Sequence, residues 1–139
     1  MMDTARRQKR DFAAVFFDTA ILAQFRFERG KASPEDIFRF ATVGAHGGTN
    51  YEVPLSWALD VPSESKFRSA DILMISDGEY AVSDDFFSRL MRTKKERGLR
   101  IMSILIGGVP QELTRWSDRV WAVTAPDDEA AGEMFAELV

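Results

Sequence analysis

Residues Ala70–Glu79 read ADILMISDGE, and this stretch decides the fold class. Its four consecutive apolar residues, Ile72–Ile75, predict a strand that is buried on both faces, as in a parallel sheet covered by helices. Similar runs occur at Phe12–Phe17, Ile101–Ile106 and Val120–Val123. Helical segments are expected between these runs, so strands and helices alternate along the chain. We therefore predict an α/β fold with a mostly parallel sheet.

One predicted strand has a different pattern. Residues Gln24–Arg29 read QFRFER, in which polar and apolar residues alternate. Such alternation is typical of a half-buried edge strand, and the short connection to Phe17 predicts an antiparallel hairpin. We expect Asp71–Asp77 to be a central strand of the sheet, where Ile75→Asp would prevent folding. Arg26→Asp on the edge strand would be tolerated.

Helix signals fill the gaps between the strands. Ser33 followed by Pro34 predicts a helix start with a capping serine and proline in the first turn. Ser83 predicts a second start, for a helix that ends at Arg97 before Gly98. Two further segments are predicted to be helical, at Tyr51–Leu59 and Asp127–Leu138.

The composition excludes several classes of protein. A chain of 139 residues has room for one domain with its own core. It contains no cysteine, which excludes disulfides, thiolate zinc sites and a cysteine nucleophile. Its net charge of −4 argues against a nucleic-acid partner, and its apolar runs are far shorter than a membrane span. We expect one cytoplasmic domain over residues 1–139, with no nucleic-acid partner and no membrane span.

Polar residues follow two of the predicted strands, and a glycine-rich loop precedes a predicted helix. Asp18 follows Phe17, Ser76-Asp77-Gly78-Glu79 follows Ile75, and Gly44–Asn50 forms the loop. In open parallel sheets, ligands bind outside the carboxyl ends of the strands. These features therefore mark the candidate site.

Each feature also has a purely structural interpretation. Asp18 can turn the hairpin, and Asp77-Gly78 can form the turn from a strand to a helix. The glycine loop can be a helix entry capped by Thr49 or Asn50. His46 has no second histidine or cysteine to support it, so a structural role is favoured. The residues alone leave these alternatives open.

Taken in order, four motifs resemble the von Willebrand factor A family: RRQKRDFAAVFFD, HGGTNYEVPLSWAL, ADILMISDGE and GLRIMSILIGG. Within that family the chain is similar to bacterial proteins encoded with MoxR-type AAA+ ATPases. The resemblance implies a three-layer, Rossmann-like fold with one antiparallel edge strand. It also implies a metal-ion-dependent adhesion site whose oxygen ligands come from three separate loops.

By this resemblance Thr49 and Asp77 are metal ligands, and the ion is Mg²⁺ or Mn²⁺, which favour hard oxygen donors. The residues expected to shape the two loops are Gly47, Gly48, Ser76 and Gly78. Those expected at the rim of the site are His46 and Glu79.

The family's Asp-x-Ser-x-Ser motif does not occur in this chain. The resemblance implies that the first strand and its metal-binding loop would lie before Met1. We therefore expect a partial domain with an incomplete metal site, and weak or absent Mg²⁺ binding in this chain. The missing strand would leave sheet edges open, so a homo-oligomer is also expected.

The leading hypothesis is a metal-ion-dependent protein-binding module that is not an enzyme. The resemblance implies an adaptor that works with a MoxR-type AAA+ ATPase. It would bind an acidic group of a partner protein through a bound divalent ion. The alternative is a small α/β Mg²⁺-dependent hydrolase or phosphoryl-transfer enzyme that uses Asp18 and Asp77. A third possibility is a degenerate member of the family that binds no ion.

Overall fold

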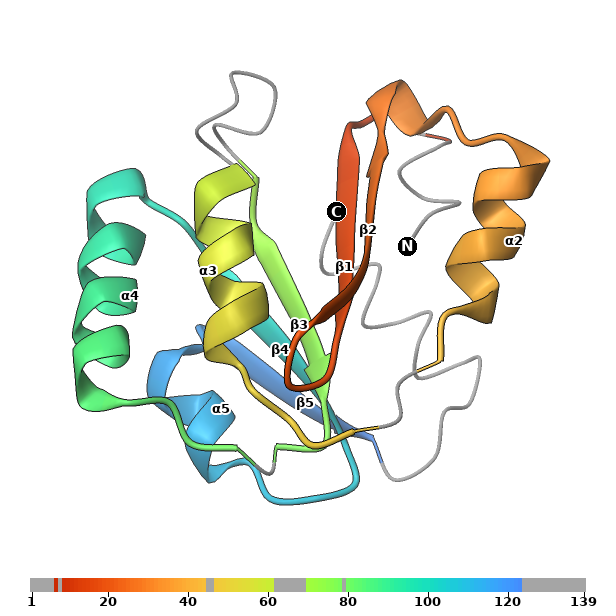
Figure 1. Cartoon of the computed structure of the whole chain (residues 1–139). Coiled ribbons are helices and arrows are strands. Elements are labelled where there is room, and N and C mark those ends of the chain that lie inside the picture. Colours follow the sequence, from red (N-terminus) through yellow and green to blue (C-terminus); the bar gives the residue numbers. More distant parts are fainter. Residues whose placement is uncertain (1–6, 8, 45–46, 62–69, 79, 124–139) are drawn as a thin grey trace. The chain divides into compact units, whose positions relative to one another are not determined.

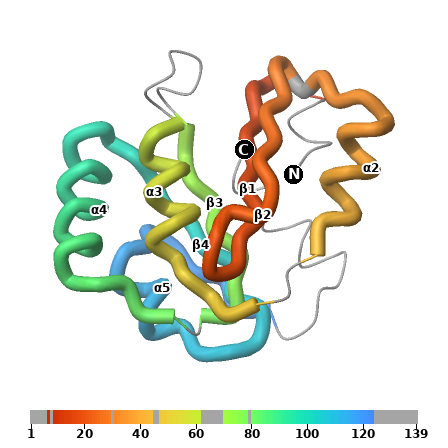
Figure 2. The backbone as a smooth tube through the Cα atoms, in the orientation of Figure 1, coloured from red at the N-terminus to blue at the C-terminus, as the bar shows by residue number. Residues whose placement is uncertain are grey.

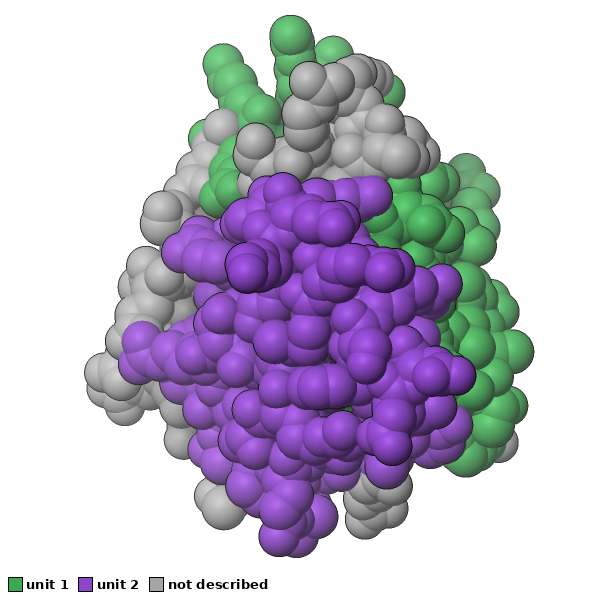
Figure 3. All heavy atoms as spheres, turned by 90° about the vertical axis from the view of Figure 1, so that its left-hand side faces the viewer, with its two compact units in different colours: residues 1–68 green, residues 69–139 purple. Residues whose placement is uncertain are grey.

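The computed structural model describes residue 7 and residues 9–44, 47–61, 70–78 and 80–123. The chain divides into two compact units, residues 1–68 and residues 69–139, which Figure 3 colours separately. The predicted helix at Asp127–Leu138 lies outside the described residues. The single domain over residues 1–139 stays a prediction, and each unit is described by itself below.

The first unit is built on an antiparallel hairpin, which confirms the predicted strand pairing. β1 (Phe12–Phe17) pairs with β2 (Ile21–Phe27), and Figure 2 traces the backbone from one strand into the other. β2 begins at Ile21 and not at Gln24 as predicted. It ends at Phe27 because Glu28–Gly30 forms a 3-10 turn (η1) in which Arg29 has a φ of 50°.

Helix α2 (Pro34–Thr42) covers one face of this hairpin. It starts at the predicted capping serine, which forms a capping box: the Asp36 amide donates to Ser33 Oγ at 3.1 Å and the Ser33 amide donates to Asp36 Oδ2 at 3.1 Å. Phe40 then places its ring 4.9 Å from that of Phe16 and 5.4 Å from that of Phe25, between centroids. Aromatic packing therefore holds α2 on the hairpin.

Helix α3 (Glu52–Asp60) contacts the opposite face of the hairpin. Trp57 Nε1 donates to Gln24 Oε1 at 2.7 Å, and the guanidinium of Arg26 lies 5.6 Å from the centre of the Trp57 ring. Gln24 and Phe25 are successive residues of β2, so their side chains point to opposite faces. The hairpin thus lies between α2 and α3 within this unit.

The second unit contains a parallel sheet with strand order β3-β4-β5, which Figure 1 shows with its two helices. The predicted parallel pairing and the long helix are confirmed, whereas the short helix α5 was not predicted. The α/β class is therefore confirmed. Among the described residues, however, the parallel sheet and the antiparallel hairpin are two separate sheets. The elements are β3 (Ile72–Ser76), α4 (Asp84–Arg97), β4 (Ile101–Ile106), α5 (Gln111–Trp116) and β5 (Arg119–Val123).

β4, and not β3, is the central strand of the sheet formed by the described residues. Ile101 and Leu105 of β4 are buried, and the buried Ser103 hydroxyl lies 2.7 Å from the Ser117 hydroxyl, which satisfies it. Ile75 of β3 is 43% exposed. The prediction of a central position for Ile75 was therefore wrong, because an unbroken apolar run does not distinguish a central strand from an edge.

Candidate functional site

In the first unit, residues 47–50 of the glycine loop pack against the turn that follows β1. The Asn50 amide donates to the Asp18 carbonyl at 2.9 Å. A Cβ at Gly47 would lie 2.8 Å from Asp18 Oδ2, and one at Gly48 would lie 3.4 Å from Thr19 Cγ2. Two residues without side chains therefore let the loop approach the Asp18 carboxylate closely. Thr49 is half-buried and lies in the chain between Gly48 and Asn50, so the contacts of its neighbours fix its position.

The structural interpretation of Asp18 is confirmed, and the loop leads into α3 as predicted, but neither Thr49 nor Asn50 is the N-cap, because Tyr51 stands at that position. Asp18 Oδ1 accepts from the Ala20 amide at 3.0 Å, and the Asp18 amide donates to the Ala20 carbonyl at 3.0 Å. Asn50 Oδ1 accepts from the Glu52 amide at 3.0 Å in the first turn of α3. Asp18 thus closes the hairpin turn, and Asn50 forms a side-chain turn just before the N-cap residue Tyr51.

Asp77 follows β3 in the second unit and is exposed. Ser76 Oγ donates to Asp77 Oδ1 at 3.3 Å and accepts from the Gly78 amide at 3.4 Å. Gly78 has a φ of 83°, a conformation that glycine adopts without strain. Ser76 and Gly78 therefore shape the turn that carries Asp77.

The loop after β4 meets this turn through a second glycine. A Cβ at Gly108 would collide with the main-chain carbonyl of Asp77. In return, a Cβ at Gly78 would collide with the Val109 carbonyl and lie 2.7 Å from Leu105 Cδ1. The glycine of each loop thus lies in close contact with a main-chain carbonyl of the other loop. Sequence reasoning missed Gly108 as a partner of Asp77.

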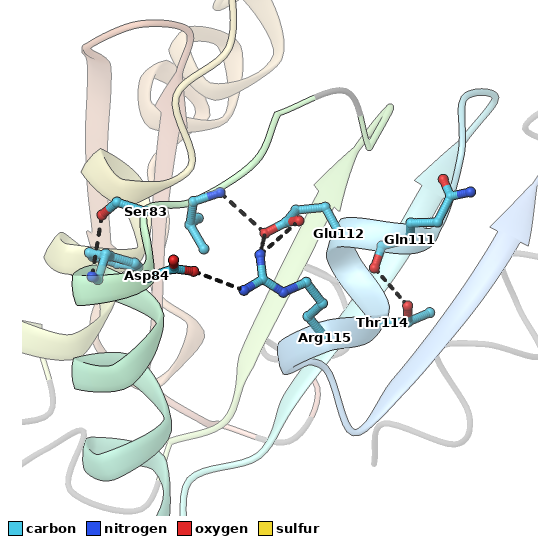
Figure 4. Close-up of polar contacts among 8 residues, drawn as sticks. Ser83, Asp84, Gln111, Glu112, Thr114 and Arg115 are labelled. Atoms are coloured by element: carbon cyan, nitrogen blue, oxygen red, sulfur yellow. Dashed lines mark hydrogen bonds and ion pairs between the residues drawn. The ribbon is translucent and has the colours of Figure 1, made fainter.

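Helix α5 also holds the segment between β3 and α4 (Figure 4). Glu112 Oε1 accepts from the Val82 amide at 3.2 Å and from Arg115 Nη1 at 2.8 Å. Arg115 Nη2 lies 3.6 Å from Asp84 Oδ1 in the first turn of α4, and Ser83 Oγ caps that helix by accepting from the Phe86 amide. This network was not predicted, because it depends on α5.

The predicted metal ligands belong to different units, Thr49 to the first and Asp77 to the second. Asp18 and Asp77, the carboxylates of the alternative enzyme, are divided in the same way. His46 and Glu79 lie outside the described residues. In the part of the chain that the structure describes, no three histidine, aspartate or glutamate side chains gather as a metal-holding group. The described helices also include none with the length and apolar character needed to cross a membrane.

Comparison with known proteins finds relatives without an assigned function. No family model matches the chain. It is 29% identical to the uncharacterized protein MJ0811 of Methanocaldococcus jannaschii over 140 residues, which cover 99% of this chain and 32% of that protein. It is 30% identical to the uncharacterized protein MJ0077 of the same archaeon, over 97% of this chain and 34% of the relative. The chain thus spans about a third of the length of these relatives.

Proposed function

We propose that this chain is part of a metal-ion-dependent protein-binding module with the three-layer fold of the von Willebrand factor A family. In this proposal Thr49 and Asp77 contribute oxygen ligands to Mg²⁺ or Mn²⁺, and the ion binds an acidic group of a partner protein. The observation that carries the proposal is the turn at Asp77. This exposed carboxylate follows a parallel strand, on a turn fixed by Ser76 and by the buried Gly78.

The place of Asp77 in the sheet supports a binding role. Ligands of open parallel sheets bind beyond the carboxyl ends of the strands, where the turn after β3 lies. The glycine loop supports the same proposal for Thr49, since Gly47 and Gly48 bring it against the turn after β1. Two protein ligands leave most of an octahedral shell to water, so binding by this chain would be weak.

The partner of the module is proposed from the motif order alone. The resemblance favours an adaptor for a MoxR-type AAA+ ATPase, acting within a protein of the length of the archaeal relatives. Further metal ligands would come from parts of that longer protein. The alternative, a Mg²⁺-dependent hydrolase or phosphoryl-transfer enzyme, stays a prediction, and turnover of generic phosphoesters would test it.

A titration with Mn²⁺, followed in ¹⁵N-resolved NMR spectra, tests the proposed site. The paramagnetic ion should broaden the amide signals of Thr49 and Gly78 over one common, millimolar range of concentration. Asp77→Ala should abolish the broadening at both positions. Asp85→Ala is the matched control, because Asp85 is an exposed acid of the same unit on α4.

Three results would overturn the proposal. The first is the absence of saturable broadening at both signals. The second is broadening that Asp77→Ala leaves unchanged. The third is broadening at Gly78 without any at Thr49, which would mean that the two loops bind no common ion.

A further inference from the structure

We propose that Gly108 is a positioning residue for Asp77, and that the loop between β4 and α5 thereby sets the geometry of the candidate site. This inference rests on the proposed function for what Asp77 does, but not for where Asp77 lies. Gly108 has a φ of 59°, and any side chain there would collide with the Asp77 carbonyl. The backbone of Asp77 can therefore keep its place only if residue 108 is glycine.

The contact is reciprocal, so each loop restricts the position of the other. Gly78, directly after Asp77, is buried and lies against the Val109 carbonyl. Ser76 is the register partner of Leu105, so the two loops leave neighbouring strands at the same level of the sheet. A displacement of the β4–α5 loop would therefore be transmitted to both sides of the Asp77 peptide.

Helix α5 extends this control to the start of α4. Glu112 accepts from the Val82 amide at 3.2 Å, and Arg115 lies 3.6 Å from Asp84. The connection from β3 to α4 is thus held near Asp77 by the β4–α5 loop and near Val82 by α5 itself. Both attachments belong to one continuous stretch of chain that starts at Gly107.

Asparagine substitutions separate this collision from ordinary backbone strain. Asparagine tolerates positive φ better than other residues with a Cβ. Gly107 and Gly98 also have positive φ, of 69° and 62°, but a Cβ at either would meet no atom within 4 Å. Gly107→Asn and Gly98→Asn are therefore matched controls for Gly108→Asn.

The experiment compares the three variants with the wild-type chain by thermal unfolding, ¹⁵N NMR and Mn²⁺ titration. In Gly108→Asn the amide signals of Asp77 and Gly78 should shift and exchange hydrogen faster. Mn²⁺ broadening at Gly78 should need about tenfold more ion, which is the usual size of an outer-shell effect on metal affinity. Gly107→Asn should keep the Asp77 and Gly78 signals and the Mn²⁺ response of the wild type.

The outcomes separate the two proposals. If the wild type shows no Mn²⁺ broadening, the proposed function fails, and the amide signals of Asp77 and Gly78 alone decide the role of Gly108. If Gly108→Asn leaves these signals in their wild-type positions, or if Gly107→Asn moves them equally, the positioning role is wrong.

A second variant covers the case in which Gly108→Asn does not fold. Val109→Gly adds no Cβ and loosens the same loop. It should speed hydrogen exchange at Asp77 and Gly78 more than at Gly98, and equal changes at these positions would overturn the inference.

Discussion

The ammonium nitrogen of Lys94, in the last turn of α4, lies 2.9 Å from Asp118 Oδ2 just before β5. The same carboxylate oxygen accepts from the Ile101 amide at 2.8 Å, and the Asp118 amide donates to the Ile101 carbonyl at 2.7 Å. Lys94 also donates to the Trp116 carbonyl at 2.9 Å. One aspartate thus joins the end of α4 to the start of β4 and to the chain entering β5.

The first prediction concerns the pH dependence of this junction. Partial burial alone would raise the pKa of Asp118, but the hydrogen bonds from Ile101 and Lys94 outweigh it and lower that pKa. A carboxylate with a lowered pKa stabilises the fold above its unfolded pKa, and this stabilisation is lost as the pH falls through the folded pKa. Asp118→Asn should therefore destabilise the protein at pH 7 and have little effect in strong acid.

The expected size of this effect is modest. The Asp118 side chain is 45% exposed, so solvent screens the ion pair. At pH 7 the loss should be about 1 kcal/mol, and it should shrink as the pH falls below about 4. Urea unfolding at a series of pH values measures it. Glu96→Gln, an exposed acid near the end of α4, is the control. A loss that is the same at pH 7 and pH 2 would contradict the prediction.

The second prediction concerns the packing of α2. Phe40 meets rings of both hairpin strands, whereas Phe38 on the same helix is 68% exposed. Phe40→Ala should cost about 2 kcal/mol of unfolding free energy, less than for a fully buried aromatic ring, because Phe40 is half-buried. Phe38→Ala should cost less than about 0.5 kcal/mol. Chemical denaturation of both variants makes the comparison, and equal losses would mean that α2 does not pack through Phe40.

Local sequence was sufficient for the elements whose signals are local. Ser33 and Ser83 cap helices as predicted, because a capping serine needs only the amides of the next turn. The apolar run Ile101–Ile106 became a buried parallel strand, since both of its faces are covered. Helix α5 (Gln111–Trp116) was missed because six residues are too few to show a helical period.

The candidate site could be predicted only in part. Its polar residues stand directly after apolar runs, so Asp18 and Asp77 were visible in the sequence. The contact of Asp77 with Gly108 was not visible, because it joins loops after two different strands and involves only backbone atoms. Similarly, the approach of Gly47 to Asp18 depends on how the loop folds back on the hairpin.

The third prediction concerns association between copies of the chain. In the sheets of the described residues, β1 pairs only with β2 and β3 pairs only with β4. Each of these two strands therefore has a partner on one side only. The predicted homo-oligomer would form through such strand edges, and a lysine on an edge strand opposes this pairing. Sedimentation at several concentrations should show association that Ile75→Lys weakens. A wild-type chain that stays monomeric at high concentration would contradict the prediction.

The last prediction concerns β3 and β4, whose apolar runs do not show which of the two strands is central. Ile104 of β4 is 5% exposed and has strands on both sides, whereas its register partner Ile75 of β3 is 43% exposed. An aspartate at position 104 would be an unpaired charge in an apolar core, because the side chain at this position is buried. Ile104→Asp should therefore cost more than about 4 kcal/mol, whereas Ile75→Asp should cost about 1 kcal/mol, because its carboxylate stays hydrated. Circular dichroism and denaturant unfolding of the two purified variants measure the difference. Loss of folded protein in both variants would mean that the face carrying Ile75 is covered in solution.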